Sequence, residues 1–235
     1  LQSILSEDRS VLDLLTANRD IVPSHEFAHE PAVVNLDARQ PFHPSDAVPT
    51  RHHEAQRRAM SGGERLSIHF VGQKAGELFG RQVHADLAQV PDPVDLAVLV
   101  VPALAMPAAL SSCGARGIRA AIVVSAGFRE AGPEGAALEQ ECLELARQHH
   151  IRILGPNCIG TIDTHLPLDT TFLQPPIPTA GGIGFVSHSG AFCAAIVDWS
   201  RNQGFGFSQI ISLGNQADVT EIRTVHHPRL HGTTK

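Results

Sequence analysis

Residues 95–127, DLAVLVVPALAMPAALSSCGARGIRAAIVVSAG, hold two uninterrupted apolar runs on either side of a helix-like segment. Apolar runs without polar alternation are typical of strands that are buried on both faces, as in a parallel sheet. The segment between them is rich in alanine and reaches Gly114 and Gly117, either of which can end a helix. The stretch therefore predicts a strand, a helix and a second, parallel strand.

The same alternation continues on both sides of this stretch. IHFVG (68–72) predicts an earlier strand, PEGAALEQECLELARQHH (133–150) a helix with proline at its start, and IRILGPN (151–157) a further strand. Alternating strands and helices indicate right-handed βαβ units on a parallel sheet. Such sheets bind ligands beyond the carboxyl ends of their strands, which here are formed by the small or proline-containing motifs VPA, VSAG and GPNCIG.

A second unit is expected after a segment rich in proline and threonine. It would contain a strand in GIGFVS (182–187), a helix in AFCAAIVDWSRNQ (191–203) and a strand in FSQIISLG (207–214). We therefore divide the chain into an uncertain N-terminal segment, a parallel-sheet unit, a linker and an incomplete second unit, at 1–30, 31–165, 166–182 and 183–235. Before residue 66 the periodicity is weak and predicts only a helix, a short strand and a poor helix, at 1–15, 31–36 and 45–60.

Composition excludes several classes of protein. No apolar stretch approaches the roughly 20 residues of a membrane-spanning helix, and no secretory signal is visible, so we expect a cytoplasmic protein with no membrane partner. The net charge is -6 and the 18 basic residues are scattered, which argues against nucleic acid as a partner. The four cysteines lack metal-ligand spacing and predict reduced thiols and no metal site; they are Cys113, Cys142, Cys158 and Cys193.

A polar break, Ser-His-Ser-Gly at 187–190, separates the strand pattern from the helix pattern in IGFVSHSGAFCAAIVDW (183–199). A serine hydrolase would need Gly-x-Ser-x-Gly here, but Ser187 stands two residues before Ser189. The free backbone N–H groups of a helix start, together with the two serine hydroxyls, form a site for an anion such as phosphate. An ordinary serine cap of the helix is the alternative.

Five stretches in unbroken order resemble the nucleoside-diphosphate-forming acyl-CoA synthetases, which are relatives of the succinyl-CoA synthetase α subunit. The same modules occur in Pat-type protein lysine acetyltransferases. The resemblance covers about residues 68–222 and is carried by VDLAVLVVPA, AAIVVSAGF, RILGPNCIGTI, GFVSHSGAFCAAIVDW and GFSQIISLGNQADV. It implies an α/β fold, with a Rossmann-like parallel-sheet CoA-binding domain followed by the start of a flavodoxin-like domain of the succinyl-CoA synthetase type.

The resemblance also implies a reaction and its participants. An ADP-forming acid–CoA ligase makes acyl-CoA, ADP and phosphate from a carboxylic acid, CoA and ATP through a phosphorylated histidine. Coenzyme A and a small carboxylic acid would be the ligands of this chain. ATP, ADP and Mg²⁺ would bind only through missing segments or through a partner, an ATP-grasp β subunit or domain. A hetero- or homo-oligomer is expected.

Site residues follow from the same resemblance. Lys74 would contact a CoA phosphate, and Pro156 and Asn157 would shape the floor of the site near the thiol. The CoA groove would be lined by backbone atoms of Pro102, Ala103, Val124, Ser125 and Ala126. The transferred phosphoryl group would be held by Ser187, Ser189 and Gly190. Cys158 is expected to serve close packing, and His188 is not expected to be the phosphorylated histidine, which the family places further along.

Two departures from the family pattern predict a chain that does not complete the ligase cycle alone. Residues 31–48, where the family has a glycine-rich turn, contain no glycine, so CoA affinity should be weakened. The segments expected after about residue 222 are missing, which predicts a truncated or frame-shifted reading frame.

The alternative to a ligase is a non-catalytic CoA- or acyl-CoA-sensing module of a protein acetyltransferase. An NAD-binding domain is a third possibility, but the missing glycine fingerprint argues against it.

Overall fold

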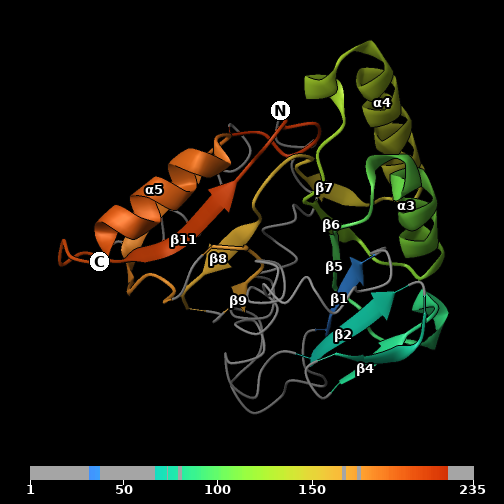
Figure 1. The fold of residues 1–235 in the computed structure, drawn as a ribbon, viewed down its shortest axis with the longest axis horizontal. Coiled ribbons are helices and arrows are strands. Elements are labelled where there is room, and N and C mark those ends of the chain that lie inside the picture. Colours follow the sequence, from blue (N-terminus) through green and yellow to red (C-terminus); the bar gives the residue numbers. More distant parts are fainter. Residues whose placement is uncertain are drawn as a thin grey trace, which may run out of the picture.

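The computed structural model describes residues 32–37, 67–72, 74–78, 81–165, 168–173 and 176–221, and these form two sheets with three α-helices (Figure 1). The helices predicted over 1–15 and 45–60 lie outside these residues, and so does the glycine-free turn expected after the strand at 31–36. Among the described helices, none has the length and apolar character required to cross a membrane.

The first sheet has seven strands in the order β3-β4-β2-β1-β5-β6-β7, and every neighbouring pair except β3–β4 is parallel. The strand predicted in 31–36 is β1, and it lies at the centre of the sheet between β2 and β5. The chain order reverses at this point, which is where open parallel sheets bind ligands. The bounds are β1 Ala32–Asp37, β2 Ser67–Gly72, β3 Gly76–Leu78, β4 Arg81–His84, β5 Leu96–Leu99, β6 Ala120–Val123 and β7 Arg152–Leu154.

Both faces of β5 and β6 are buried, as the apolar runs predicted. On β5, Leu96 and Val98 enter one core cluster, whereas Ala97 and Leu99 enter the other, because successive side chains of a strand point to opposite faces. Helices α3 (Met106–Ala115) and α4 (Pro133–Gln148) lie on the side of Ala97 and Leu99 (Figure 1). Helix α3 contains Gly114, and the turn that follows it is made by Gly117 at φ 73°.

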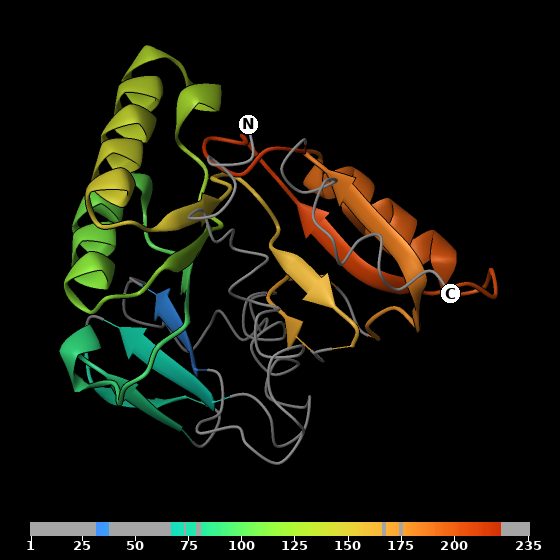
Figure 2. The ribbon, with the colours of Figure 1, turned by 180° about the vertical axis from the view of Figure 1, so that it is seen from behind.

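The second sheet has the order β10-β11-β8-β9, with bounds β8 Thr161–Asp163, β9 Leu168–Asp169, β10 Ala180–Ser187 and β11 Phe207–Ser212. Strands β10 and β11 are parallel and are joined by α5 (Gly190–Ser200), which packs against both of them (Figure 2). The other pairs are antiparallel. Strands β8 and β9 were not predicted, and β9 lies within the segment interpreted as a linker.

The two units share a core and a backbone contact. Leu168 and Ile211 of the second sheet, and Leu213 just after it, belong to the same buried cluster as Phe70 and Val98 of the first sheet. The segment after β11 runs beside β7, where three of its amides donate to first-unit carbonyls: Asn215 to Pro156, Ala217 to Gly155 and Val219 to Ile153. The junction between the units is therefore a packed part of the fold, and it is where the cavity described next lies.

Candidate functional site

A cavity of about 660 Å³ lies at the junction, where the carboxyl ends of β5, β6 and β7 meet the start of α5. Its volume is within the usual range for small-molecule sites. Six of the residues proposed from the sequence line it: Val124, Ser125, Ala126, Asn157, Ser189 and Gly190. The strand ends and the polar break thus form one site, although Ser125 and Ser189 are more than 60 positions apart in the sequence.

The other five proposed residues do not line this cavity. Lys74 is exposed just beyond β2, and Pro102 caps the short helix η2 (Ala103–Ala105), of which Ala103 is the first residue. The Pro156 carbonyl is occupied because it accepts from the Asn215 amide. The Ser187 hydroxyl accepts from the Ser189 amide at 3.1 Å.

Residues that were not proposed complete the cavity. Val100 extends the β5 edge, Ile159 and Phe172 supply apolar wall, and Cys158, His188 and Ala191 lie next to proposed residues in the chain. The polar break itself was the signal for His188, which lies within it, and for Ala191, which follows it directly. Phe172 lies 46 residues after Ala126 in the chain, and no local pattern marks it.

The start of α5 has two open backbone donors. The Ser189 hydroxyl accepts from the Phe192 amide at 3.2 Å, so its side chain is the helix cap that sequence analysis left as an alternative. Within the described part of the chain, the amides of Gly190 and Ala191 have no hydrogen-bond partner, as expected for the first turn of a helix. Both residues line the cavity, so these amides are available to an anion there.

Close packing explains the glycine at position 190. A Cβ atom placed on Gly190 would lie 2.6 Å from Cγ2 of Ile159, which itself lines the cavity. Such a separation is far below normal van der Waals contact, so a larger residue would push α5 away from the loop after β7. Gly190 therefore keeps the helix start close to the first unit.

The opposite wall is fixed by backbone contacts. The Ser125 hydroxyl donates to the Val101 carbonyl, which joins the ends of β5 and β6. The Asn157 amide donates to the Ser125 carbonyl at 2.9 Å, which joins the ends of β6 and β7. Asn157 adopts φ 57°, a left-handed conformation that asparagine tolerates better than most residues. Asn157 lines the cavity, and its side-chain amide donates to Asn215 Oδ1 at 3.4 Å.

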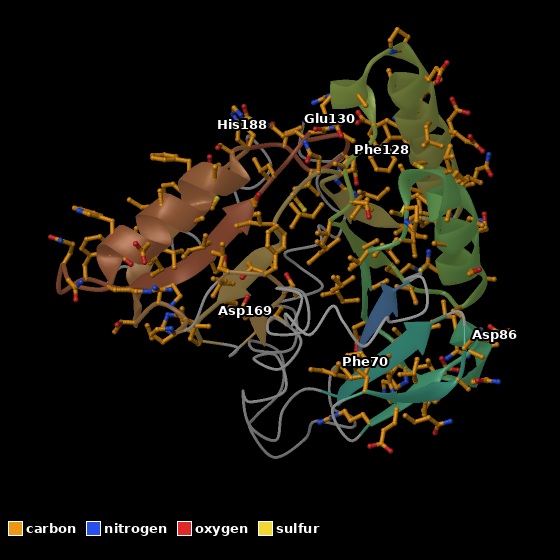
Figure 3. All side chains as sticks on the ribbon, viewed as in Figure 1. Phe70, Asp86, Phe128, Glu130, Asp169 and His188 are labelled. Atoms are coloured by element: carbon orange, nitrogen blue, oxygen red, sulfur yellow. The ribbon has the colours of Figure 1, made fainter. Side chains whose placement is uncertain are left out.

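Charge in the cavity comes from the helix start and not from basic side chains. Among the residues that line it, none is lysine or arginine, and His188 is exposed just before α5, on the side that faces the loop carrying Glu130 (Figure 3). Lys74 lies at the same edge of the sheet, but β1 and β5 separate β2 from β6, which corresponds to roughly 14 Å at the usual strand spacing. Within the described ranges, no group of three or more His, Cys, Asp or Glu side chains could hold a metal ion.

Cys158 lines the cavity but is not suited to nucleophilic chemistry. It is buried, and burial raises the pKa of its thiol to about 12. The thiol donates weakly to the Val123 carbonyl. Because only the thiolate is an effective nucleophile, Cys158 packs the wall, as the sequence predicted.

Comparisons with known proteins agree with the fold. Residues 31–164 match the family model described as CoA binding domain, and residues 180–235 match the succinyl-CoA ligase like flavodoxin domain. An acetate–CoA ligase [ADP-forming] I of Archaeoglobus fulgidus is 42% identical over 155 residues, covering 66% of this chain and 22% of the relative. The α subunit of acetate–CoA ligase [ADP-forming] I of Pyrococcus furiosus is 39% identical over 158 residues, covering 66% of this chain and 34% of the subunit.

A solved structure shows the same arrangement. The dinucleotide forming acetyl-coenzyme A synthetase 1 of Ca. Korarchaeum cryptofilum, in complex with phosphate and ADP, superposes with a TM-score of 0.75 at 28% identity. The superposition covers 84% of this chain and 42% of that one. This chain thus spans about a fifth to a third of the length of the two curated relatives described above.

Proposed function

The chain belongs to the CoA binding domain family, and from this premise we propose that it is the CoA-binding and phosphate-holding part of an ADP-forming acid–CoA ligase. The complete enzyme would convert a carboxylic acid, CoA and ATP to acyl-CoA, ADP and phosphate. The observation that supports this most is the single cavity into which the strand ends of the first unit and the open amides of α5 both face. A CoA thiol and a phosphoryl group must meet in such an enzyme.

The first unit would bind CoA along the carboxyl edge of its sheet. Val124, Ser125 and Ala126 line the cavity and would offer backbone atoms to CoA, and the small side chains of Ser125 and Ala126 allow close approach. Pro102 and Ala103 continue the same edge outside the cavity, and Lys74 lies beyond them, where an ammonium group would meet a phosphate of an extended ligand. CoA, when bound, supplies the thiol that becomes the thioester.

The second unit would hold the phosphoryl group. Two free amides and a helix dipole equivalent to about half a positive charge favour a doubly charged anion at Gly190 and Ala191. Ser187 and Ser189 contribute indirectly, because their hydroxyls accept from backbone amides and so fix the turn before the helix. Asn157, across the cavity, could donate its side-chain amide to a carbonyl or phosphate oxygen.

Other segments or subunits would complete the enzyme. One relative is named as an α subunit, and this chain matches only part of it. We therefore propose that ATP, ADP and Mg²⁺ bind to a partner subunit or domain, that the assembly is oligomeric, and that a small carboxylic acid is the second substrate. We place the protein in the cytoplasm, where its four unpaired, buried cysteines would remain reduced.

Calorimetric titration of the unaltered chain with CoA tests this proposal, and NAD serves as the competing ligand. We expect saturable heat with CoA and none with NAD. Ala126→Glu places a carboxylate in the cavity wall and should abolish the CoA signal, whereas Ala136→Glu, on the exposed face of α4, should leave it unchanged. An absence of CoA binding by the folded chain, or equal binding by both variants, would contradict the proposal.

A further inference from the structure

A polar cluster with a buried centre, Asn215 and Glu139, lies beside the cavity, and Asn215 follows β11. The side chain of Asn215 is 8% exposed, and its amide nitrogen donates to Glu130 Oε2 and to Glu139 Oε2, the latter at 2.9 Å. Its amide oxygen accepts a long bond from Asn157 Nδ2 at 3.4 Å. One side chain of the second unit thus contacts three polar side chains of the first unit.

Two of these contacts reach the loops after β6 and β7, through Glu130 and Asn157, and the third reaches α4. Glu130 Oε1 accepts from the amides of Gly127 and Phe128 at 2.6 and 3.1 Å, so this carboxylate clamps the loop that begins with Ser125 and Ala126. Glu139 is buried on α4, and its other oxygen lies 3.6 Å from Arg129 Nη1. Figure 3 shows Glu130 and Phe128 at the edge of the first unit that faces the second.

The chemistry of the cluster requires an amide at position 215. Two carboxylates converge on one nitrogen, and the uncharged NH₂ group of asparagine offers a separate N–H to each of them. An aspartate there would add a third negative charge, and an apolar residue would leave a buried carboxylate without its donor. Burial opposes ionisation of Glu130, but the hydrogen bonds from Asn215 and from the Gly127 and Phe128 amides outweigh it and lower its pKa.

We infer that Asn215 is a positioning residue for CoA, which holds the loops after β6 and β7 in their binding geometry from the second unit. The inference rests on the proposed function, because it assigns a task to Asn215 in binding that ligand. It also gives the docking of the second unit a role in CoA affinity, since Asn215 reaches Glu130 only while the segment after β11 lies beside β7.

Calorimetric titration of the full chain and its variants with CoA tests the inference. Asn215→Leu should weaken CoA binding by on the order of tenfold, as expected when a loop loses a charge-assisted hydrogen bond that orders it. Gln209 provides the matched control, because its side-chain amide donates to Asp163 at similar burial on β11 but does not reach the cavity. Gln209→Leu should lower stability and leave CoA affinity within about twofold.

A pH profile separates positioning from general loss of stability. In Asn215→Asp, protonation of one of the three neighbouring carboxyl groups restores a donor, so CoA affinity relative to the unaltered chain should recover as the pH falls from about 7.5 to 5.5. Gln209→Glu should show no such recovery. Glu130→Gln, at an exposed residue that can be changed without loss of the fold, should weaken CoA binding and speed amide exchange at Gly127 and Phe128.

The outcomes are distinct. Weaker CoA binding in the Asn215 and Glu130 variants, with the Gln209 variants unaffected, supports the inference. If the Asn215 and Glu130 variants bind CoA as tightly as the unaltered chain does, the inference alone is overturned. The inference is also overturned if the Gln209 variants lose as much CoA affinity as the Asn215 variants. No binding of CoA by the unaltered chain overturns the proposed function, and the inference with it.

Discussion

Asp218 connects the two units through an ion pair that can be removed by one substitution. Its carboxylate accepts from Arg152 Nε at 2.8 Å, from Arg152 Nη2 at 3.0 Å and from the Ile153 amide at 2.9 Å. The side chains of Arg152 and Asp218 are 12% and 24% exposed, so solvent screens the pair only partly. Asp218→Ala removes all three contacts.

The expected loss of stability is about 2–3 kcal/mol. Breaking a fully buried pair costs about 3–5 kcal/mol, and an exposed pair contributes less than about 1 kcal/mol, so a partly buried bidentate pair lies between them. For a chain of this size, that loss lowers the melting temperature by roughly 5–10 °C. Urea denaturation followed by circular dichroism measures the free energy, and a thermal scan measures the temperature.

Asp198→Ala is the matched control. Asp198 pairs with Arg201 one turn away on the surface, and its side chain is 77% exposed. Its removal should cost at most about 0.5 kcal/mol. Equal losses in the two variants, or a loss below about 1 kcal/mol for Asp218→Ala, would refute the conclusion that this contact holds the second unit to the first.

Three further predictions follow from the site. Gly190→Ala should lower the free energy of unfolding by about 1–2 kcal/mol in urea denaturation, because its Cβ would meet Ile159; a gain in stability, as helix propensity alone predicts, would contradict the packing argument. Burial raises the pKa of the thiols of Cys113, Cys142 and Cys158 to about 12 and that of Cys193 to about 11. All four thiols should therefore react with a disulfide reagent at pH 8 only after unfolding. Rapid reaction of any of them in the native chain would contradict this prediction. The pKa of Glu130 lies below its ordinary value of 4.5, so the contribution of its carboxylate to stability should be present above pH 4.5 and be lost as the pH falls through the lowered pKa. Denaturation measured from pH 6 to pH 3 should show a weaker pH dependence of stability in Asn215→Leu, which lacks one of the hydrogen bonds that lower this pKa. An unchanged pH dependence in Asn215→Leu would disagree with that hydrogen bond as a cause of the shift.

The central strands and helices could be predicted because their patterns are local. The apolar runs of β5 and β6 and the proline at the start of α4 depend only on neighbouring residues, and the structure confirms all three elements. Strands β3, β4, β8 and β9 have two to four residues each and, unlike β5 and β6, do not lie in long apolar runs, so only their pairing with other strands defines them.

The site was predicted in part for the same reason. Strand ends and a helix start are visible in sequence, and the family resemblance implied roles for Ser125, Asn157 and Gly190 there; these three residues line one cavity. The hydrogen bonds of Asn215 were not foreseeable, because they join residues 58, 76 and 85 positions apart. Sequence also could not show that the Ser189 hydroxyl caps its own helix, since this depends on the backbone angle at the turn.

A crystal structure of this chain grown with CoA and inorganic phosphate tests the central claim most directly. We predict that the pantetheine arm of CoA crosses residues 124–126 and that phosphate accepts from the amides of Gly190 and Ala191. CoA on a different surface, or side chains of the chain itself occupying those two amides, would contradict the account.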